Sequence, residues 1–146
     1  MSNIRKAQAK DLGRIAEIEV FNYRLNFFPI FKSEWFYFVE LTVENVAGRY
    51  KHLLDYIWVY EDVAVKGFVM VEQGQIRKLF VEPVLQSGGI GKNLLDFAVN
   101  QLGGRYLWAL EKNTRALEFY RRNGFALTGD KKLEEDTTEY LVKMEI

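Results

Sequence analysis

The stretch PVLQSGGIGKNLLDFAV, residues 83–99, places three glycines within four positions directly before an apolar segment with helical spacing. Glycine is costly in regular structure, because ordering it loses more backbone entropy than ordering any other residue. The amides at a helix N-terminus lack intrahelical partners and carry a partial positive charge, and glycines let an anion approach them closely. The stretch therefore predicts a phosphate-binding turn. A turn that serves only close strand–helix packing is the alternative.

Two well-known phosphate loops do not fit this stretch. A P-loop would need a glycine five residues before Gly91 and a serine or threonine after Lys92, where the chain has Gln86 and Asn93. A dinucleotide-binding turn would need a third glycine where Leu94 stands, within an opening strand–helix–strand unit. A phosphate bound here must therefore belong to another class of ligand.

The composition is that of an ordinary globular chain of 146 residues, with 49% hydrophobic and 27% charged residues. This length favours one domain that spans residues 1–146. Lys plus Arg and Asp plus Glu both number 20, so no net field favours nucleic acid or an anionic membrane. Cysteine is absent, and no apolar run approaches the roughly 20 residues that cross a bilayer. We therefore expect a cytoplasmic enzyme or binding protein without a nucleic-acid or membrane partner.

Hydrophobic periodicity predicts helices first and antiparallel strands next in the N-terminal half. Asp11 is expected to cap the first helix, and Pro29 to interrupt it. The central strands are rich in β-branched and aromatic residues and are separated by tight turns. The expected elements are a strand at 3–7, a helix after Asp11, a second helical region at 34–54, and strands at 56–62, 64–73 and 75–83.

The C-terminal half is expected to alternate strands and helices. Gly103-Gly104 should end the helix that follows the glycine stretch, Asn113 should cap the next helix, and Gly124 should end it. The charged segment 130–136 is most simply a solvated loop. The expected elements are a helix at 89–102, a strand at 106–111, a helix from Asn113 to Gly124, and strands at 124–129 and 137–146.

Three blocks of sequence follow one another between residues 75 and 127. Gln86-Ser87-Gly88-Gly89-Ile90-Gly91 fits the pattern Gln/Arg-x-x-Gly-x-Gly/Ala, LFVEP (79–83) precedes it, and LWALEKNTRALEFYRRNGF (107–125) follows it. These blocks resemble the acetyl-CoA loop, the splayed strand and the later strand–helix–strand of the GNAT superfamily of N-acetyltransferases. The resemblance implies a mixed α+β fold of the broad α/β class. In it, about four helices flank a mostly antiparallel sheet of six to seven strands, splayed at the acetyl-CoA site.

The resemblance also implies an activity, the transfer of an acetyl group from acetyl-CoA as co-substrate to a primary amine without a metal. The acceptor would be a small-molecule amine, a peptide N-terminus or a lysine, and the enzyme a monomer or homodimer. Because the chain has no cysteine, no cysteine thioester can form, which favours direct attack in a ternary complex. A CoA-binding module without transferase activity and a protein-interaction domain on the same fold are the alternatives.

The implied cofactor site uses mostly backbone groups. The pyrophosphate would lie on the amides of residues 87–92, with Lys92 as an additional charge. The pantetheine arm would pair with strand 79–81, where the amide of Phe80 or Val81 would act as an oxyanion donor. Asn113 would hydrogen-bond the pantetheine, although it also suits a plain helix cap. The expected cofactor-binding residues are Leu79, Phe80, Val81, Gln86, Ser87, Gly88, Gly89, Ile90, Gly91, Lys92, Asn113 and Tyr120.

Tyr120 is the implied catalytic residue, which would donate a proton to the departing CoA thiolate. It follows Asn113 by seven residues, which places both on one helix face, and a plain core tyrosine is the alternative. No general base is assigned, because Gln75 and Arg77 stand where many relatives carry glutamates. The remaining candidates, which are also ordinary surface residues, are Glu34, Glu40, Glu72 and Glu82. Glu111 matches the family block, but that position alone does not make it a base, and the single histidine, His52, is expected to be structural or exposed.

Overall fold

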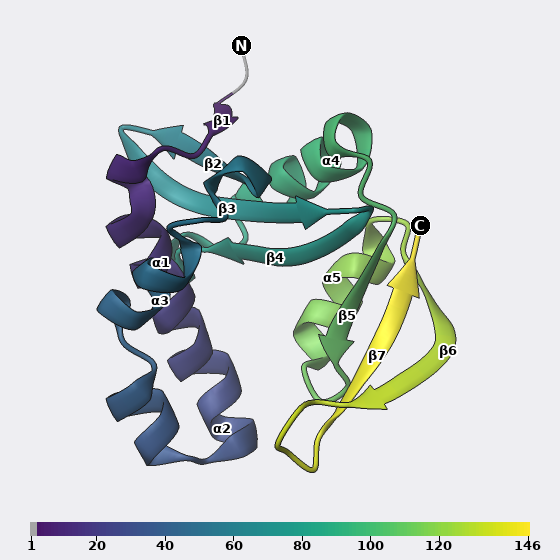
Figure 1. The fold of residues 1–146 in the computed structure, drawn as a ribbon. Coiled ribbons are helices and arrows are strands. Elements are labelled where there is room, and N and C mark those ends of the chain that lie inside the picture. Colours follow the sequence, from purple (N-terminus) through teal and green to yellow (C-terminus); the bar gives the residue numbers. More distant parts are fainter. Residues whose placement is uncertain (1–2) are drawn as a thin grey trace.

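The computed structural model describes residues 3–146, which form one seven-stranded sheet with helices on both faces (Figure 1). The strand order is β1-β2-β3-β4-β5-β7-β6, and every neighbouring pair is antiparallel except β4 and β5. The mostly antiparallel sheet predicted from the sequence is confirmed. The strands are β1 Ile4–Lys6, β2 Ile57–Asp62, β3 Ala64–Glu72, β4 Gln75–Val81, β5 Tyr106–Leu110, β6 Ala126–Leu133 and β7 Tyr140–Glu145.

The helices divide between the two faces of the sheet. The N-terminal helices cover one face, and α4 and α5 cover the other. Short 3₁₀ turns, η1 Ala9–Asp11, η4 Leu54–Tyr56 and η5 Pro83–Leu85, join the elements. The helices are α1 Leu12–Asn22, the π-helical turn η2 Tyr23–Phe27, α2 Phe28–Phe31, the π-helical turn η3 Phe36–Glu40, α3 Val43–Tyr50, α4 Ile90–Leu102 and α5 Thr114–Arg122.

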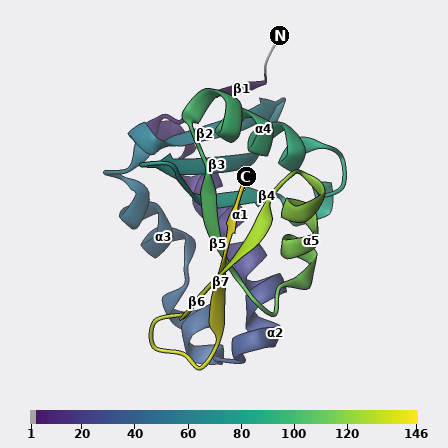
Figure 2. The same cartoon turned by 90° about the vertical axis from the view of Figure 1, so that its right-hand side faces the viewer.

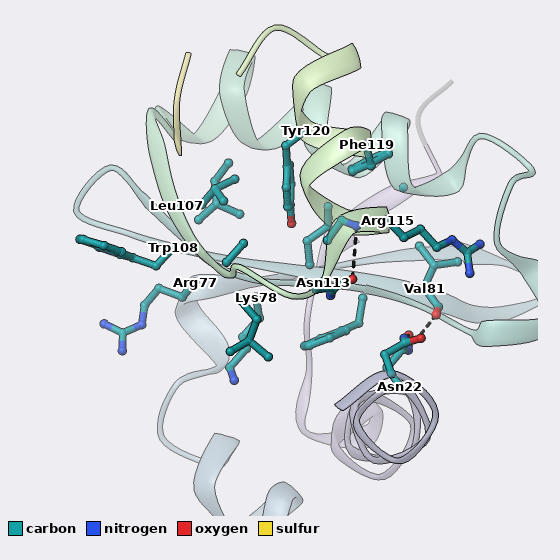
Figure 3. Close-up of a pocket in the computed structure, with 18 of the residues that line it drawn as sticks. Asn22, Arg77, Lys78, Val81, Leu107, Trp108, Asn113, Arg115, Phe119 and Tyr120 are labelled. Atoms are coloured by element: carbon teal, nitrogen blue, oxygen red, sulfur yellow. Dashed lines mark hydrogen bonds between the residues drawn. The ribbon is translucent and has the colours of Figure 1, made fainter. Parts of the chain in front are cut away.

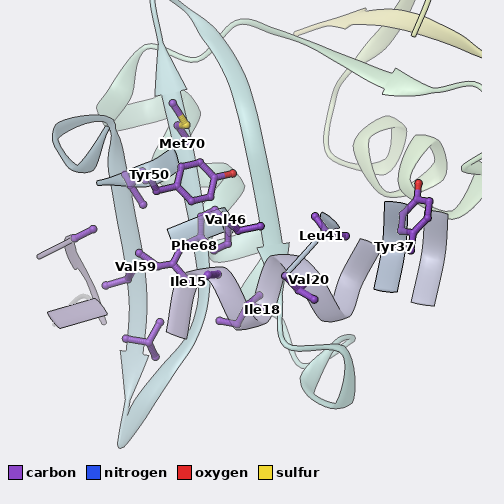
Figure 4. Packing of buried hydrophobic residues seen from close by; sticks show 14 residues of the cluster. Ile15, Ile18, Val20, Tyr37, Leu41, Val46, Tyr50, Val59, Phe68 and Met70 are labelled. Atoms are coloured by element: carbon purple, nitrogen blue, oxygen red, sulfur yellow. The ribbon is translucent and has the colours of Figure 1, made fainter. Parts of the chain in front are cut away.

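Each face of the sheet has its own core, because side chains alternate along a strand. Phe68 of β3 packs on the face of α1 and α3, in a cluster with Ile15, Ile18 and Val46 (Figure 4). Its neighbour Val69 lies in the other cluster, below α4 and α5. Each fully buried aliphatic side chain stabilises the fold by about 1.5–3 kcal/mol. The two cores therefore fix the helices on either side of the sheet.

The sheet parts between its two central strands. β4 and β5 pair only at Gln75 and Tyr106, and beyond this point they diverge. The half formed by β1–β4 and the half formed by β5, β7 and β6 make a V in Figure 1, and Figure 2 shows the second half from its own side. The parting occurs along β4, where the family resemblance implied a splayed strand.

Two expectations about the N-terminal helices are wrong. Pro29 does not interrupt the first helix, because α1 continues through η2 into α2 and ends at Lys32, whose φ of 58° is left-handed. Pro29 lies in the first turn of α2, where a missing N–H is tolerated, and the wider π-helical turn precedes it. Residues 34–54 do not form one helical region. The chain leaves helical geometry at Leu41 (φ −82°, ψ 84°), and the side chain of Thr42 caps a new helix, α3.

Residues 130–136 are not wholly the solvated loop that their charges suggest. β6 continues through the first of them to Leu133, with Lys132 paired to Leu141 of β7. All side chains of β6 are exposed, so the strand rests on backbone pairing and leaves no alternating apolar pattern in the sequence. An irregular register after Leu127 interrupts the pairing and lets the strand bend.

Asp11 does not cap α1 with its side chain, contrary to the expectation from the sequence. Its carboxylate instead accepts the Gln8 amide at 2.8 Å and two hydrogen bonds from the Arg5 guanidinium at 2.8 and 2.9 Å. Arg5 also donates to Glu61 at 2.9 Å, so this cluster ties β1 to β2 and to the start of α1. The hydrogen bonds from Arg5 hold the pKa of Asp11 below its ordinary value.

We predict that Asp11→Asn lowers the free energy of unfolding at pH 7 by about 2 kcal/mol, because the partly buried Arg5 loses its main partner. Since folding lowers the pKa of Asp11, its stabilisation is present above the ordinary carboxyl pKa and is lost as the pH falls through the lowered value. Urea unfolding at pH 7 and in acid measures both effects. Asp55→Asn, which removes an exposed ion pair with Lys6, is the control and should cost less than about 1 kcal/mol. Equal stability of Asp11→Asn and the parent chain at pH 7 would contradict this role.

Candidate active site

The parting of β4 and β5 opens a cavity of about 760 Å³ (Figure 3). Its walls come from both strands, the segment between β4 and α4, α5, the end of α1 with η2, and the end of β6. Phe119 and Tyr120 of α5 approach it from one face of the sheet, whereas Asn22 and Lys78 lie on the face of α1. Residues from both helix layers therefore line one cavity.

The segment between β4 and α4 turns through two left-handed residues, Ser87 (φ 73°) and Gly89 (φ 89°). Gly89 is the N-cap residue of α4, and no side chain caps this helix. The amides of the first turn are consequently left without helical partners at the positive end of the helix dipole. Because Gly89, Gly91 and Lys92 line the cavity, an anion such as a phosphate could reach these amides.

Gly91 also has a role in packing. A Cβ at this position would lie 3.4 Å from the ring of Phe119 and 3.7 Å from the side chain of Val81, so glycine lets α4 approach α5 and β4. A Cβ at Gly89 would meet nothing within 4 Å, and Gly89 is needed for its left-handed backbone. The packing interpretation thus holds for Gly91, while the first-turn amides stay open to an anion.

Most of the cofactor-binding residues predicted from the sequence line this one cavity. The exceptions are Gly88 and Ile90, and Ile90 packs against the core below α4. Lys92 lines the cavity, but its ammonium lies 2.7 Å from the carboxylate of Asp96. The predicted residues that line the cavity are Leu79, Phe80, Val81, Gln86, Ser87, Gly89, Gly91, Lys92, Asn113 and Tyr120.

The side chain of Gln86 braces the loop. Its Nε2 donates to Asn22 Oδ1 at 3.0 Å and to the carbonyl of Val81 at 3.2 Å. Asn22, which is buried in α1, also donates to the Val81 carbonyl, at 2.9 Å (Figure 3). The carbonyl that β5 leaves unpaired is thus satisfied by two side chains, and the glycine segment is tied to α1.

Backbone directions single out the amide of Val81. The amide of Glu82 donates to the carbonyl of Lys66 in β3 at 2.9 Å, and N–H groups alternate in direction along a strand. The amide of Phe80 therefore points to β3, whereas that of Val81 points into the gap that β5 leaves. Of the two oxyanion donors considered from the sequence, Val81 is the one whose amide faces the cavity.

Tyr120 directs its hydroxyl into the cavity from α5 (Figure 3). Burial raises the pKa of this phenol, so it stays protonated at neutral pH and can donate a hydrogen bond. Asn113 caps α5 by accepting the Ala116 amide at 3.3 Å, and it also lines the cavity. The two positions are compatible, because the cap uses Oδ1 of Asn113 and leaves Nδ2 for a ligand.

None of the four glutamates considered as bases lines the cavity, and neither does Glu111. Glu82 forms an ion pair with Arg14 at 2.8 Å, and Glu111 forms one with Lys131 at 2.9 Å. Among residues 3–146, the one carboxylate that lines the cavity is Glu134, directly after β6. The sequence did not reveal Glu134, because its segment was interpreted as a solvated loop.

A cluster of hydrogen-bonded side chains borders the cavity on the face of α1. Lys78 of β4 donates to the hydroxyl of Tyr23, and its ammonium lies 3.8 Å from the buried carboxylate of Glu19. Tyr50 of α3 donates to the same carboxylate, and burial together with this carboxylate raises the pKa of Tyr50. The sequence contains one signal for the cluster: Glu19 follows the buried Ile15 by four residues, which places a carboxylate on the apolar face of α1.

Three further findings describe the site within residues 3–146. No group of three or more His, Asp or Glu side chains in this range is arranged to hold a metal ion. No helix in the same range is long and apolar enough to cross a membrane. His52 is exposed and does not line the cavity.

Residues 54–127, half of the chain, match the family model of the acetyltransferase (GNAT) domain. The chain belongs to the GNAT acetyltransferase family. The match runs from the turn before β2 to the start of β6, so it includes the splayed strands, the glycine segment and α5. The resemblance drawn from the three sequence blocks is confirmed.

One curated relative of this GNAT protein is the peptidyl-lysine N-acetyltransferase YjaB of Salmonella typhimurium. The two are 32% identical over 69 residues, which are 47% of this chain and 48% of YjaB. The chain therefore matches about half the length of this curated relative.

Solved structures share the fold over nearly the whole chain. The solution structure of apo YjaB from Escherichia coli has a TM-score of 0.78 at 20% identity, covering 97% of this chain and 95% of that one. The crystal structure of the PaiA N-acetyltransferase from Thermoplasma acidophilum, in complex with coenzyme A, has a TM-score of 0.69 at 20% identity over 98% of both chains. These likenesses show the mixed α+β GNAT fold.

We predict that Gly91→Leu weakens acetyl-CoA binding at least about tenfold, since the side chain would occupy space beside Phe119 and Val81 at the first-turn amides. Isothermal titration calorimetry measures the affinity, and the melting temperature reports whether the fold is kept. Gly48→Leu is the control, because a Cβ at Gly48 in α3 meets nothing within 4 Å. Unchanged affinity in a folded Gly91→Leu protein would refute a phosphate site at this turn.

Proposed function

We propose that this GNAT protein transfers the acetyl group of acetyl-CoA to a primary amine by direct attack in a ternary complex. The observation that carries the proposal is the cavity between β4 and β5. It is bordered by the first-turn amides of α4, which lack helical partners, by the amide of Val81 and by the hydroxyl of Tyr120. Family membership, and the coenzyme A in the PaiA structure, support acetyl-CoA as the co-substrate. The name of YjaB, a peptidyl-lysine N-acetyltransferase, supports lysine side chains among the acceptors.

The donor site follows from the order of these groups along the chain. The pyrophosphate would accept hydrogen bonds from the first-turn amides of α4, which the left-handed Gly89 leaves open. The pantetheine arm would lie in the gap along β4 and pair with its backbone as an added strand. Nδ2 of Asn113, which the helix cap leaves free, would donate to one of its carbonyl groups.

The reaction replaces a C–S bond by a C–N bond. The amine nitrogen attacks the thioester carbonyl carbon, and negative charge develops on the carbonyl oxygen. The amide of Val81 would stabilise this charge, since it points into the gap and has no partner on β5. Collapse of the tetrahedral species then forms the amide bond and expels the CoA thiolate, while the amine nitrogen loses one proton.

Tyr120 would stabilise the departing thiolate by donating a hydrogen bond. A thiol has a pKa of about 8.5 and an ordinary phenol about 10, and burial raises the pKa of Tyr120 further. Full proton transfer from Tyr120 to the thiolate is therefore energetically unfavourable. The hydrogen bond would stabilise the negative charge on sulfur chiefly while the C–S bond breaks. Loss of the hydroxyl should slow the reaction without abolishing it.

Glu134 is our candidate for the general base. An alkylammonium with a pKa near 10.4 is only about 0.1% neutral at pH 7.4, a penalty of about 4 kcal/mol, so a carboxylate that takes up a proton would help. Glu134 is the one carboxylate that lines the cavity among residues 3–146, and its amide is held by the carbonyl of Glu139 at 2.8 Å. Contact with the amine would be direct or through one water.

Replacing Tyr120 by Phe should lower kcat about 10–100-fold and leave the affinity for acetyl-CoA nearly unchanged, because only the hydrogen bond to the thiolate is lost. Release of free thiol, followed with an aromatic disulfide reagent, measures the rate. Because the pKa of Tyr120 is raised, its protonation should not limit the parent enzyme anywhere between pH 7 and 9.5. An unchanged kcat in Tyr120→Phe would mean that Tyr120 is only a packing residue.

Replacing Glu134 by Gln should lower kcat/KM at pH 7 about 10–100-fold, and the deficit should shrink as the pH approaches the pKa of the amine. A base becomes unnecessary once solvent has deprotonated the acceptor. Glu135→Gln is the neighbouring control, because Glu135 does not line the cavity. A deficit of the same size at pH 7 and pH 10 would count against a base and point to a structural role.

The proposed function as a whole is tested by adding acetyl-CoA and a panel of amines and lysine peptides. Thiol release that depends on an amine supports it. Stabilisation by acetyl-CoA without thiol release from any acceptor would instead indicate a CoA-binding module. Absence of any rise in melting temperature with acetyl-CoA would leave a protein-interaction domain on the GNAT fold.

A further inference from the structure

Cationic side chains line the cavity on both sides. Lys92, Arg115 and Arg122 come from α4 and α5, whereas Arg77, Lys78 and Lys132 come from β4 and β6, where the acceptor would enter; among residues 3–146, the one lining carboxylate is that of Glu134. A polyamine or another multiply charged cation would meet repulsion at this entrance. The arrangement instead suits a molecule that brings negative charge together with its amine.

A β-bulge places two of these cations on the same side of β4. Ile76 pairs with Val71 of β3 and Lys78 pairs with Met70, so Arg77 is an extra residue between them. In a regular strand, Arg77 and Lys78 would point to opposite faces. Figure 3 shows both side chains extending on the same side of the strand, away from Tyr120.

Lys132 reaches the same end of the cavity from β6. Gln75 of β4 pairs with Tyr106 of β5. Arg77 and Trp108 lie two residues further along these strands, which places them opposite each other where the strands begin to part. The ammonium of Lys132 lies 4.3 Å from the centroid of the Trp108 ring. Among residues 3–146, no carboxylate forms an ion pair with Lys132, so its charge is available to a ligand.

The acidic side chains near these cations leave most of their positive charge without a close ion-pair partner. Glu19 is buried beside Lys78, and Glu72 reaches Arg77 only at 3.9 Å, the limit of an ion pair. Tyr23 accepts a hydrogen bond from Lys78, and its own hydroxyl proton has no acceptor within residues 3–146. Because Tyr23 lines the cavity, this proton can be donated to an oxygen of a bound molecule.

We propose that the acceptor is an amine that carries a carboxylate close to its amino group. Arg77 and Lys132 hold the carboxylate with help from the hydroxyl of Tyr23, and the amino group lies toward Glu134, which lines the same cavity. The carboxylate belongs either to a small amino acid or to an acidic side chain next to a lysine in a peptide. This inference rests on the proposed function, since it names the acceptor class of the same reaction.

The test compares acceptors that differ only in this charge. The small probes are 4-aminobutyrate and 6-aminohexanoate with their carboxamides, and the peptide probes are acetyl-Glu-Lys-Glu-amide and acetyl-Gln-Lys-Gln-amide. Thiol release gives kcat/KM, and the melting temperature in saturating CoA gives binding of each probe independently of chemistry. We expect the carboxylate member of at least one pair to be favoured about tenfold or more, which also tells whether the source is small or peptidic.

Two variants link the preference to the named cations. Arg77→Gln and Lys132→Gln should each reduce the preference at least about fivefold through KM, while the affinity for acetyl-CoA stays the same. Lys51→Gln, an exposed change at the end of α3 and outside the cavity, should leave the preference unchanged. If the two variants instead weaken acetyl-CoA binding, the cations serve the cofactor and the inference is overturned.

The remaining outcomes are also decisive. Thiol release with equal or faster reaction of the uncharged probes would overturn the inference and leave the proposed function standing. No thiol release from any probe would count against the proposed function, and the melting temperatures would then decide on the inference alone. Carboxylate-selective stabilisation that Arg77→Gln and Lys132→Gln abolish would support it, and no selective stabilisation would overturn it.

Discussion

The carbonyl of Val81 is the constraint on which the site depends. Where β4 and β5 part, this carbonyl loses the strand that would have paired with it. A buried carbonyl left unsatisfied costs about 1–3 kcal/mol. Asn22 and Gln86 both donate to it, so the sheet can stay open at this place without that penalty. The same strand leaves the amide of Val81 facing the gap, where a ligand with a backbone-like edge could pair with it.

The charges around the opening follow from the same geometry. Lys78 lies at the wall of the cavity, and its neighbours Glu19 and Tyr23 belong to the helix that also carries Asn22. A buried carboxylate such as Glu19 requires hydrogen bonds and an opposite charge, which Tyr50 and Lys78 supply. One continuous helix, from α1 into η2, therefore supports the open strand and also places polar side chains beside Lys78 at the cavity.

The sequence predicted the parts of the fold that leave local marks. The glycine stretch, the cap at Asn113 and the three central strands are in place, because glycines, caps and apolar periods act within a few residues. The continuation past Pro29 and the length of β6 could not be predicted in this way, since a π-helical turn and a fully exposed strand leave no periodic pattern. The same applies to the site: its backbone groups follow from motifs, whereas Glu134 and Lys132 reach it only through the pairing of β6 with β7.

In the proposed function, the two faces of the sheet would have different tasks. Tyr120 and the first turn of α4 lie on the face of the second core, whereas Lys78 contacts Tyr23 and Glu19 on the face of α1, which we propose as the acceptor side. In the proposed function, the donor would bind from one face and the acceptor from the other, and they would meet at the amide of Val81. Both substrates could then be bound at once, as the proposed ternary complex needs. A chain without cysteine has no thiol that could hold the acetyl group between the binding of donor and acceptor, so an opening with access from both faces would suit the proposed direct transfer.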